Sequence, residues 1–157
     1  FDELCNADPS VPIGLNDLVA GVDFRFANGK LVTKSKDFVL VASDNTNGLG
    51  SKGGFIRTKQ DISALTRYVF FKLEYDEELE AQLCGNRKWA EYVQKARAFA
   101  NSGVNTPVAI TPRASINGAA LLEAGIPARE VADATIFSHC GPDVRETIVS
   151  SIGEYIP

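Results

Sequence analysis

The fold prediction depends on residues 38–50, which read Phe-Val-Leu-Val-Ala-Ser-Asp-Asn-Thr-Asn-Gly-Leu-Gly. The first five of these residues, Phe38 to Ala42, are all apolar, which is typical of a strand buried on both faces of a parallel sheet. A polar and glycine-rich loop follows the strand, from Asn45 to Gly54. Because open α/β sheets hold their ligands at the carboxyl ends of the strands, this loop marks the edge of a predicted binding site.

The segments on both sides of this stretch alternate between strand and helix patterns, which predicts an α/β fold. Strand patterns are found at residues 1–4, 22–26, 30–33 and 67–73, and a short helix pattern at residues 8–21. Asn28-Gly29 lies between two of the strand patterns and is a strong signal for a two-residue hairpin turn.

The second half of the chain reads as all helix. Asp76 is expected to cap a long helix with glutamates in its first turn, and Gly85-Asn86 is a candidate break in that helix. Further helix starts are predicted at Thr111-Pro112, Pro127 and Pro142. The change in composition near residue 75 predicts two domains, an α/β core at residues 1–75 and a helical domain at residues 76–157.

Composition excludes several classes of protein. The 157 residues contain 16 Lys and Arg against 20 Asp and Glu, so the composition does not indicate a strongly basic surface for nucleic-acid binding. No run approaches the ~18 apolar residues of a membrane span, and we expect no membrane partner. Three cysteines and one histidine lack the spacing of zinc sites and fit a reducing compartment, which predicts a cytoplasmic protein. The chain begins at Phe1 and contains no Met, so we expect it to be part of a longer polypeptide.

Two adjacent carboxylates, Asp2 and Glu3, end the first predicted strand. One carboxylate there is suited to hold Mg²⁺ while its neighbour polarises an attacking water, and the amide of Asn45 is placed to orient that water. Arg67 and Arg113 are candidate phosphate partners because guanidinium groups make bidentate contacts with phosphate. The structural alternatives stay open: a solvated acidic pair, and arginines that pair with carboxylates or with a helix end.

Together these residues resemble the AAA+ ATPases, and within them the MoxR group and the ATPase subunit of cobaltochelatase. The most specific similarity is the pattern Ala-x-x-Asn-Thr-x-Gly-Leu-Gly, which residues 42–50 match. Phe1-Asp2-Glu3-Leu4 is similar to the Walker B step, and Thr111-Pro112-Arg113-Ala114 to the start of the second-sensor helix. Thr66-Arg67-Tyr68 is similar to the arginine-finger step, although Thr66 stands where the family has Asp. The resemblance runs from Phe1 to about Phe137.

The resemblance implies a fold and a set of residue roles. The fold would be the later part of a P-loop AAA+ parallel-sheet core followed by an all-helical lid. Asp2 would bind Mg²⁺, and Glu3 would be the catalytic base. Asn45 would be the first sensor, and Arg113 would touch the phosphates of ATP. Arg67 would reach the nucleotide of a neighbouring subunit, with Arg57 as the second candidate for this arginine finger.

The resemblance also implies a function. The intact protein would be an ATP hydrolase with ATP and Mg²⁺ as cofactors, assembled as a homo-oligomeric ring that remodels a protein client, such as a chelatase partner subunit. The sequence holds no Gly-x-x-x-x-Gly-Lys-Ser/Thr motif, so the isolated chain is expected to be inactive and to bind ATP weakly or not at all.

Two alternatives to this function come from other classes. Residues 30–59 hold six basic and two acidic side chains, which favours a nucleic-acid motor or loader of the same superfamily. Residues 74–80 hold five acidic side chains. Both charged segments are equally well explained as solvated faces. The other alternative is a non-catalytic interaction module whose motif residues are relics.

Overall fold

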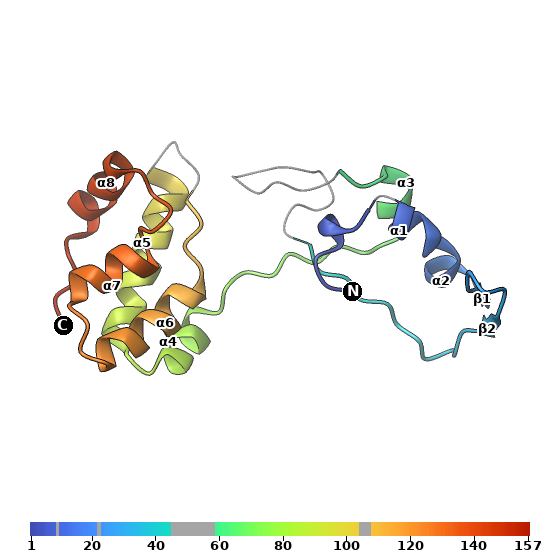
Figure 1. Cartoon of the computed structure of the whole chain (residues 1–157), viewed down its shortest axis with the longest axis horizontal. Coiled ribbons are helices and arrows are strands. Elements are labelled where there is room, and N and C mark those ends of the chain that lie inside the picture. The colour runs from blue at the N-terminus through green and yellow to red at the C-terminus, as the bar shows by residue number, and fades with distance from the viewer. Residues whose placement is uncertain (9, 22, 45–58, 104–107) are drawn as a thin grey trace. The chain divides into compact units, whose positions relative to one another are not determined.

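The computed structural model describes residues 1–8, 10–21, 23–44, 59–103 and 108–157 (Figure 1). The chain divides into two compact units, which we call unit 1 (residues 1–72) and unit 2 (residues 73–157). Asn45 and Arg57, both predicted to be functional, lie outside the described residues. Within the described residues, no helix is both long and apolar enough to span a membrane.

The described part of unit 1 is built from short elements. They are a 3₁₀ turn at Leu4–Asn6, the helices α1 (Ser10–Gly14), α2 (Asn16–Ala20) and α3 (Ile62–Leu65), and the strands β1 (Asp23–Arg25) and β2 (Leu31–Thr33). The single helix predicted over residues 8–21 is therefore two short helices. Asp61 caps α3, because its carboxylate accepts hydrogen bonds from the backbone N–H groups of Ser63 and Ala64.

The predicted hairpin is confirmed, with a longer turn than expected. β1 and β2 are antiparallel, and Phe24 lies opposite Val32. Phe26 N–H donates to the Lys30 carbonyl at 2.9 Å, so the connection has three residues, and Gly29 takes a φ of 84° at its end. This left-handed conformation suits glycine and matches the three-residue hairpin loop, in which a type I turn precedes a left-handed residue.

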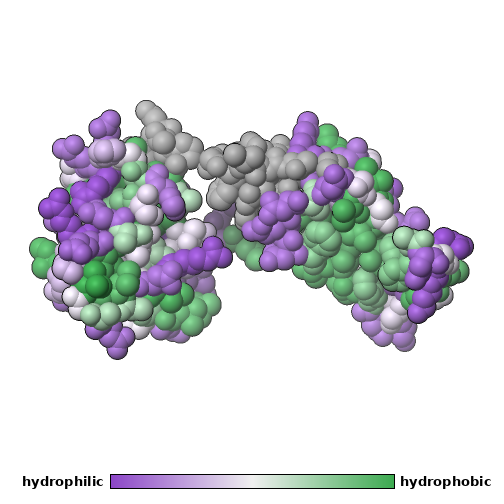
Figure 2. Space-filling model, in the orientation of Figure 1, coloured by the Kyte–Doolittle hydropathy of each residue, from purple (hydrophilic) through white to green (hydrophobic). Residues whose placement is uncertain are grey.

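The predicted α/β core with a parallel sheet is wrong. The β1–β2 hairpin is the one sheet found in the described residues. Residues 38–42, predicted as a buried strand, and residues 67–73, predicted as a further strand, form no strand. Val39, Phe71 and Leu73 are 78%, 82% and 91% exposed. An apolar run becomes a buried strand only where flanking strands pair its backbone and other elements cover its faces. In the described part of unit 1 no assigned strand lies beside either run, and Figure 2 shows a broad apolar area on this unit.

Residues 1–4, which hold the acidic pair, nevertheless pair through their backbone with the end of the predicted 38–42 strand. The amino group of Phe1 donates to the Val41 carbonyl at 2.7 Å, and Ser43 N–H donates back to the Phe1 carbonyl at 3.0 Å. Leu4 N–H then donates to the Ser43 carbonyl at 2.9 Å. The first two bonds have the pattern of a parallel ladder, and the third is shifted by one residue. Together they place residues 1–4 beside residues 41–43.

Unit 2 is a bundle of helices, as the sequence predicts. The helices are α4 (Glu77–Cys84), α5 (Arg87–Gly103), α6 (Pro112–Glu123), α7 (Ala128–Thr135) and α8 (Pro142–Ile152). Asp76 caps α4 by accepting a 2.9 Å hydrogen bond from Leu79 N–H. Gly85 ends α4 with a φ of 71°, which confirms the predicted break.

Trp89 lies at the centre of the core of unit 2. Its side chain is fully buried, and its indole Nε1 donates to the Ala114 carbonyl at 3.2 Å. The rings of Tyr92 and Tyr155 lie 5.8 and 5.0 Å from the indole, centroid to centroid. Gly118 of α6 lies directly against the indole, which leaves no space for a side chain there. α5 therefore packs closely on α6 through a large ring set against a glycine.

Candidate functional site

The acidic pair lies in unit 1, where residues 1–4 pair with residues 41–43. The Asp2 carboxylate accepts a hydrogen bond from the Ser43 hydroxyl and a 3.0 Å bond from Glu3 N–H. Glu3 N–H also donates to the Ser43 hydroxyl oxygen at 3.0 Å. Both carboxylates are exposed. Ser43 therefore fixes the position of Asp2 while leaving the acidic pair accessible to solvent.

Glu3 has a backbone conformation that is uncommon for its residue type. Its φ of 49° and ψ of 59° lie in the left-handed region, and it is the one described residue other than glycine with a positive φ. The turn at Glu3 ends the parallel pairing and directs the chain into the 3₁₀ turn at Leu4–Asn6. The Glu3 carboxylate accepts a hydrogen bond from the Asn6 side-chain amide, so it is held against the 3₁₀ turn. Uncommon backbone conformations of this kind are concentrated at functional sites.

The other predicted residues are not gathered around this pair. Arg67 follows α3 in a turn rather than beginning a strand, and its Nη1 donates to the Ser63 carbonyl at 2.5 Å. Arg113 is exposed in the first turn of α6, in unit 2. The structure thus brings Asp2 and Glu3 together with Ser43, and it shows only local contacts at Arg67.

Sequence reasoning missed the carboxylate that lies close to Arg67 in the chain. Hydrogen bonds from the side chain and the backbone of Ser63 lower the pKa of Asp61, and the positive charge of Arg67 adds a smaller effect in the same direction. Asp61 is the first residue of an Asp-x-Ser pattern at a helix start, which is a recognisable capping signal. Its role is to hold the start of α3.

The oxygen atoms around Asp2 are suitable ligands for Mg²⁺. No cluster of three or more His, Cys, Asp or Glu side chains that could hold a metal ion is found in the described residues. Proteins, however, usually bind Mg²⁺ with one or two carboxylates, completed by water and substrate phosphates. The Asp2 carboxylate and the Ser43 hydroxyl provide a donor set of this kind.

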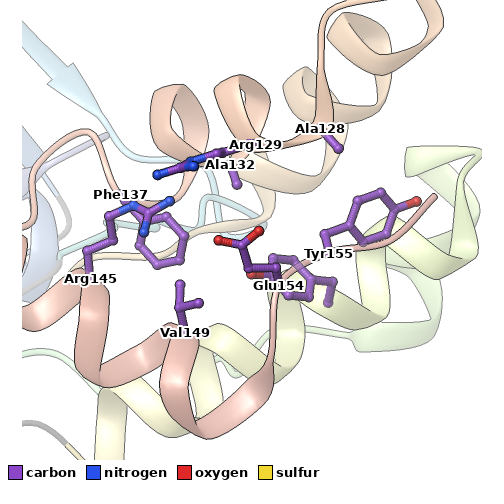
Figure 3. A pocket seen from close by; sticks show the side chains of 9 residues that line it. Ala128, Arg129, Ala132, Phe137, Arg145, Val149, Glu154 and Tyr155 are labelled. Atoms are coloured by element: carbon purple, nitrogen blue, oxygen red, sulfur yellow. The ribbon is translucent and has the colours of Figure 1, made fainter.

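A small pocket in unit 2 is lined by residues of α5, α7, α8 and the segment after α8 (Figure 3). Figure 3 shows Arg129 and Arg145 at this pocket together with Glu154. Arg145 Nε donates to the Asp133 carboxylate at 2.5 Å, a bond that raises the pKa of Arg145. Because Arg145 is paired with Asp133 and Glu154 also lines the pocket, the described side chains give it no strong positive charge with which to attract an anion.

A second polar cluster in unit 2 is buried. Glu80 of α4 accepts a 2.6 Å hydrogen bond from Arg97 of α5 and another from the Ser115 hydroxyl of α6. The side chains of Arg97 and Glu80 are 7% and 2% exposed. The Tyr75 ring centroid lies 4.8 Å from the guanidinium carbon of Arg97. The prediction of a solvated face over residues 74–80 is thus wrong for Glu80, which joins three helices from the inside.

The chain matches no protein-family model, and no curated protein matches it. Any functional conclusion therefore depends on the motifs and on the geometry described above.

Proposed function

We propose that the chain supplies part of the catalytic site of an ATP hydrolase similar to the AAA+ ATPases. The observation that supports the proposal is the pairing of residues 1–4 with residues 41–43. It fixes Asp2 against Ser43, two residues before Asn45, although these two segments are about forty residues apart in the sequence. The described start of the 42–50 motif therefore lies beside the Phe1-Asp2-Glu3-Leu4 motif in unit 1, which supports the proposal.

In this proposal each residue has a distinct task. Asp2 and Ser43 bind Mg²⁺, and the ion, when bound with ATP, neutralises charge on the phosphate oxygens. Glu3 accepts a proton from the attacking water, and Asn45 orients that water. Arg113 contacts phosphate oxygens of ATP, and Arg67 reaches the nucleotide of a neighbouring subunit. We further propose that the protein is cytoplasmic and acts as a homo-oligomeric ring on a protein client.

The proposal requires a phosphate-binding loop from outside residues 1–157, because this sequence contains no P-loop motif. Residues 1–157 alone are expected to bind MgATP with a dissociation constant above about 1 mM, since the backbone N–H cradle and its lysine are missing. Isothermal titration calorimetry of the purified chain with MgATP measures this. Micromolar binding by residues 1–157 would contradict the assignment.

The catalytic role of Glu3 is tested in a polypeptide that joins residues 1–157 to a P-loop. Glu3→Gln is expected to lower ATP hydrolysis at least ~100-fold while nucleotide binding is kept, because glutamine cannot accept the proton of the attacking water. Steady-state phosphate release and nucleotide titration measure the two properties separately.

The matched control for Glu3→Gln is Asp17→Asn, which neutralises an exposed carboxylate in the first turn of α2. This control should hydrolyse ATP at the unmodified rate. If Glu3→Gln also hydrolyses ATP normally, the acidic pair is not catalytic, and a non-catalytic interaction module becomes the better description.

A further inference from the structure

The β1–β2 hairpin lies in unit 1 (Figure 1), and one of its two faces carries aromatic and aliphatic side chains. Because side chains alternate along a strand, Phe24, Phe26 and the cross-strand Val32 share this face. The rings of Phe24 and Phe26 meet edge to face, with centroids 4.9 Å apart. Phe26 is 48% exposed and Val32 is 40% exposed, so the face is open to solvent. We call it the phenylalanine face.

Positive charge accompanies the phenylalanine face at the tip of the hairpin. Phe26 pairs with Lys30 through the backbone, which places the lysine on the same face. Arg25, from the other face, reaches the turn, where its Nη1 lies 3.5 Å from the Gly29 carbonyl. Both cations are exposed.

The one carboxylate of the described hairpin residues lies on the other face. Asp23 shares that face with Arg25 and accepts a 2.7 Å hydrogen bond from the Thr33 hydroxyl. A third cation, Lys34, is directed elsewhere, since its ammonium group donates to the Leu18 carbonyl at 3.0 Å. The phenylalanine face therefore carries Lys30 and no carboxylate from the described hairpin residues, and Arg25 adds a second cation where its side chain reaches the turn.

We propose that the phenylalanine face binds single-stranded nucleic acid, with bases against Phe26 and phosphates at Arg25 and Lys30. Single strands combine flat rings, which stack on aromatic side chains, with regularly spaced phosphates, which attract cations. An acidic peptide offers the charge but no flat ring for Phe26. This inference goes beyond ATP hydrolysis and does not depend on it.

Fluorescence anisotropy with a labelled oligothymidylate of about 20 nucleotides tests the proposal on residues 1–157 at low salt. Phe26→Ala is expected to weaken binding about 5-fold or more, and Phe26→Trp to retain it, because stacking needs an aromatic ring. The matched control is Leu31→Ala, which removes a 52% exposed apolar side chain from the opposite face. This control should bind as tightly as the unmodified chain.

The salt dependence of binding reports the pairing of cations with phosphates. Removal of one cation that pairs with a phosphate of a single strand reduces the slope of log affinity against log salt by about 0.7. Lys30→Gln and Arg25→Gln should each show a reduction of this size. Lys88→Gln, which removes an exposed lysine from α5 in unit 2, should leave the slope unchanged.

Three results would overturn the proposal. The first is no binding of the oligothymidylate at low salt, and the second is unchanged affinity of Phe26→Ala. The third is displacement of the oligothymidylate by a polyglutamate peptide of similar charge at equal concentration, which would show that the surface recognises acidic peptide. Circular dichroism of each variant confirms that the compared proteins are folded, and the retained binding of Phe26→Trp separates stacking from hairpin stability.

Discussion

Arg97→Met is expected to destabilise unit 2 by about 3–5 kcal/mol, because it leaves the carboxylate of Glu80 in the bundle interior without its cation. The carboxylate would retain only the hydrogen bond from the Ser115 hydroxyl. Its side chain is 2% exposed, so water cannot replace the guanidinium. Urea denaturation measures the decrease in stability, and Trp89, the single tryptophan of the chain, gives a fluorescence signal specific to unit 2.

An exposed ion pair of the same composition provides the control for Arg97→Met. Arg87 and Glu78 also lie 2.6 Å apart, but their side chains are 60% and 58% exposed. Arg87→Met should therefore destabilise unit 2 much less than Arg97→Met, because water solvates the remaining carboxylate. Equal destabilisation by Arg87→Met and Arg97→Met would show that burial of the Glu80 pair has no energetic importance.

A triple variant shows whether the intact buried ion pair itself stabilises unit 2, or whether only its disruption is destabilising. Glu80→Leu, Arg97→Met and Ser115→Ala together remove both charges and the hydroxyl that bonds to Glu80. We expect this variant to be considerably more stable than Arg97→Met alone, since apolar replacements of buried ion pairs are often neutral or stabilising. A triple variant as unstable as Arg97→Met would contradict this account.

Gly118→Ala is expected to destabilise unit 2 by about 3 kcal/mol, although alanine is the better helix former. A Cβ atom at position 118 would overlap the Trp89 indole, at 2.5 Å from its Cε2 and Cζ2 atoms. Trp89 is fully buried among Tyr92 and Tyr155 and cannot move aside without repacking the core. Thermal unfolding followed by circular dichroism measures the effect.

Two further variants identify steric overlap as the cause of the Gly118→Ala effect. Asn117→Ala changes the adjacent, exposed position of α6 and should slightly stabilise the helix. Trp89→Phe shortens the ring, so Gly118→Ala should cost less in the Trp89→Phe background than in the unmodified chain. If Gly118→Ala stabilises the protein, helix propensity outweighs the overlap, and the close packing of α5 on α6 is not important for stability.

The helices of unit 2 were predictable because local signals determine them. Asp76 caps α4, Gly85 ends it, and Pro112 and Pro142 occupy first-turn positions of α6 and α8. Each signal acts within one turn of helix, so it is readable from a few consecutive residues. The β1–β2 hairpin was predictable for the same reason, since the residues of its turn determine it locally.

The parallel sheet could not be predicted in the same way, because sheet formation depends on residues distant in sequence. Residues 38–42 have the composition of a central strand, but composition does not supply the neighbouring strands that such a strand requires. In the part of the chain that the structure describes, this segment and the residue after it contribute the short pairing of Val41 and Ser43 with Phe1 and Leu4.

In the candidate site, too, residues marked by a local motif were predictable, and partners distant in sequence were not. The motifs identified Asp2 and Glu3, but not the Ser43 hydroxyl that holds Asp2, because this partner is 41 residues away. Glu80 was read as part of a solvated acidic run, since its partners Arg97 and Ser115 lie on other helices. A carboxylate in a charged run gives no sign of burial until its three-dimensional neighbours are known.

The contact of Tyr75 with Arg97 joins the start of the helical bundle to a helix that is distant from it in sequence. Tyr75 immediately precedes the Asp76 cap, and its ring lies on a guanidinium in the interior of α5. The same guanidinium pairs with Glu80 of α4, so Arg97 contacts the chain both before and within this helix. Substitution of Arg97 therefore removes a contact of the segment that leads into α4 as well as the buried ion pair.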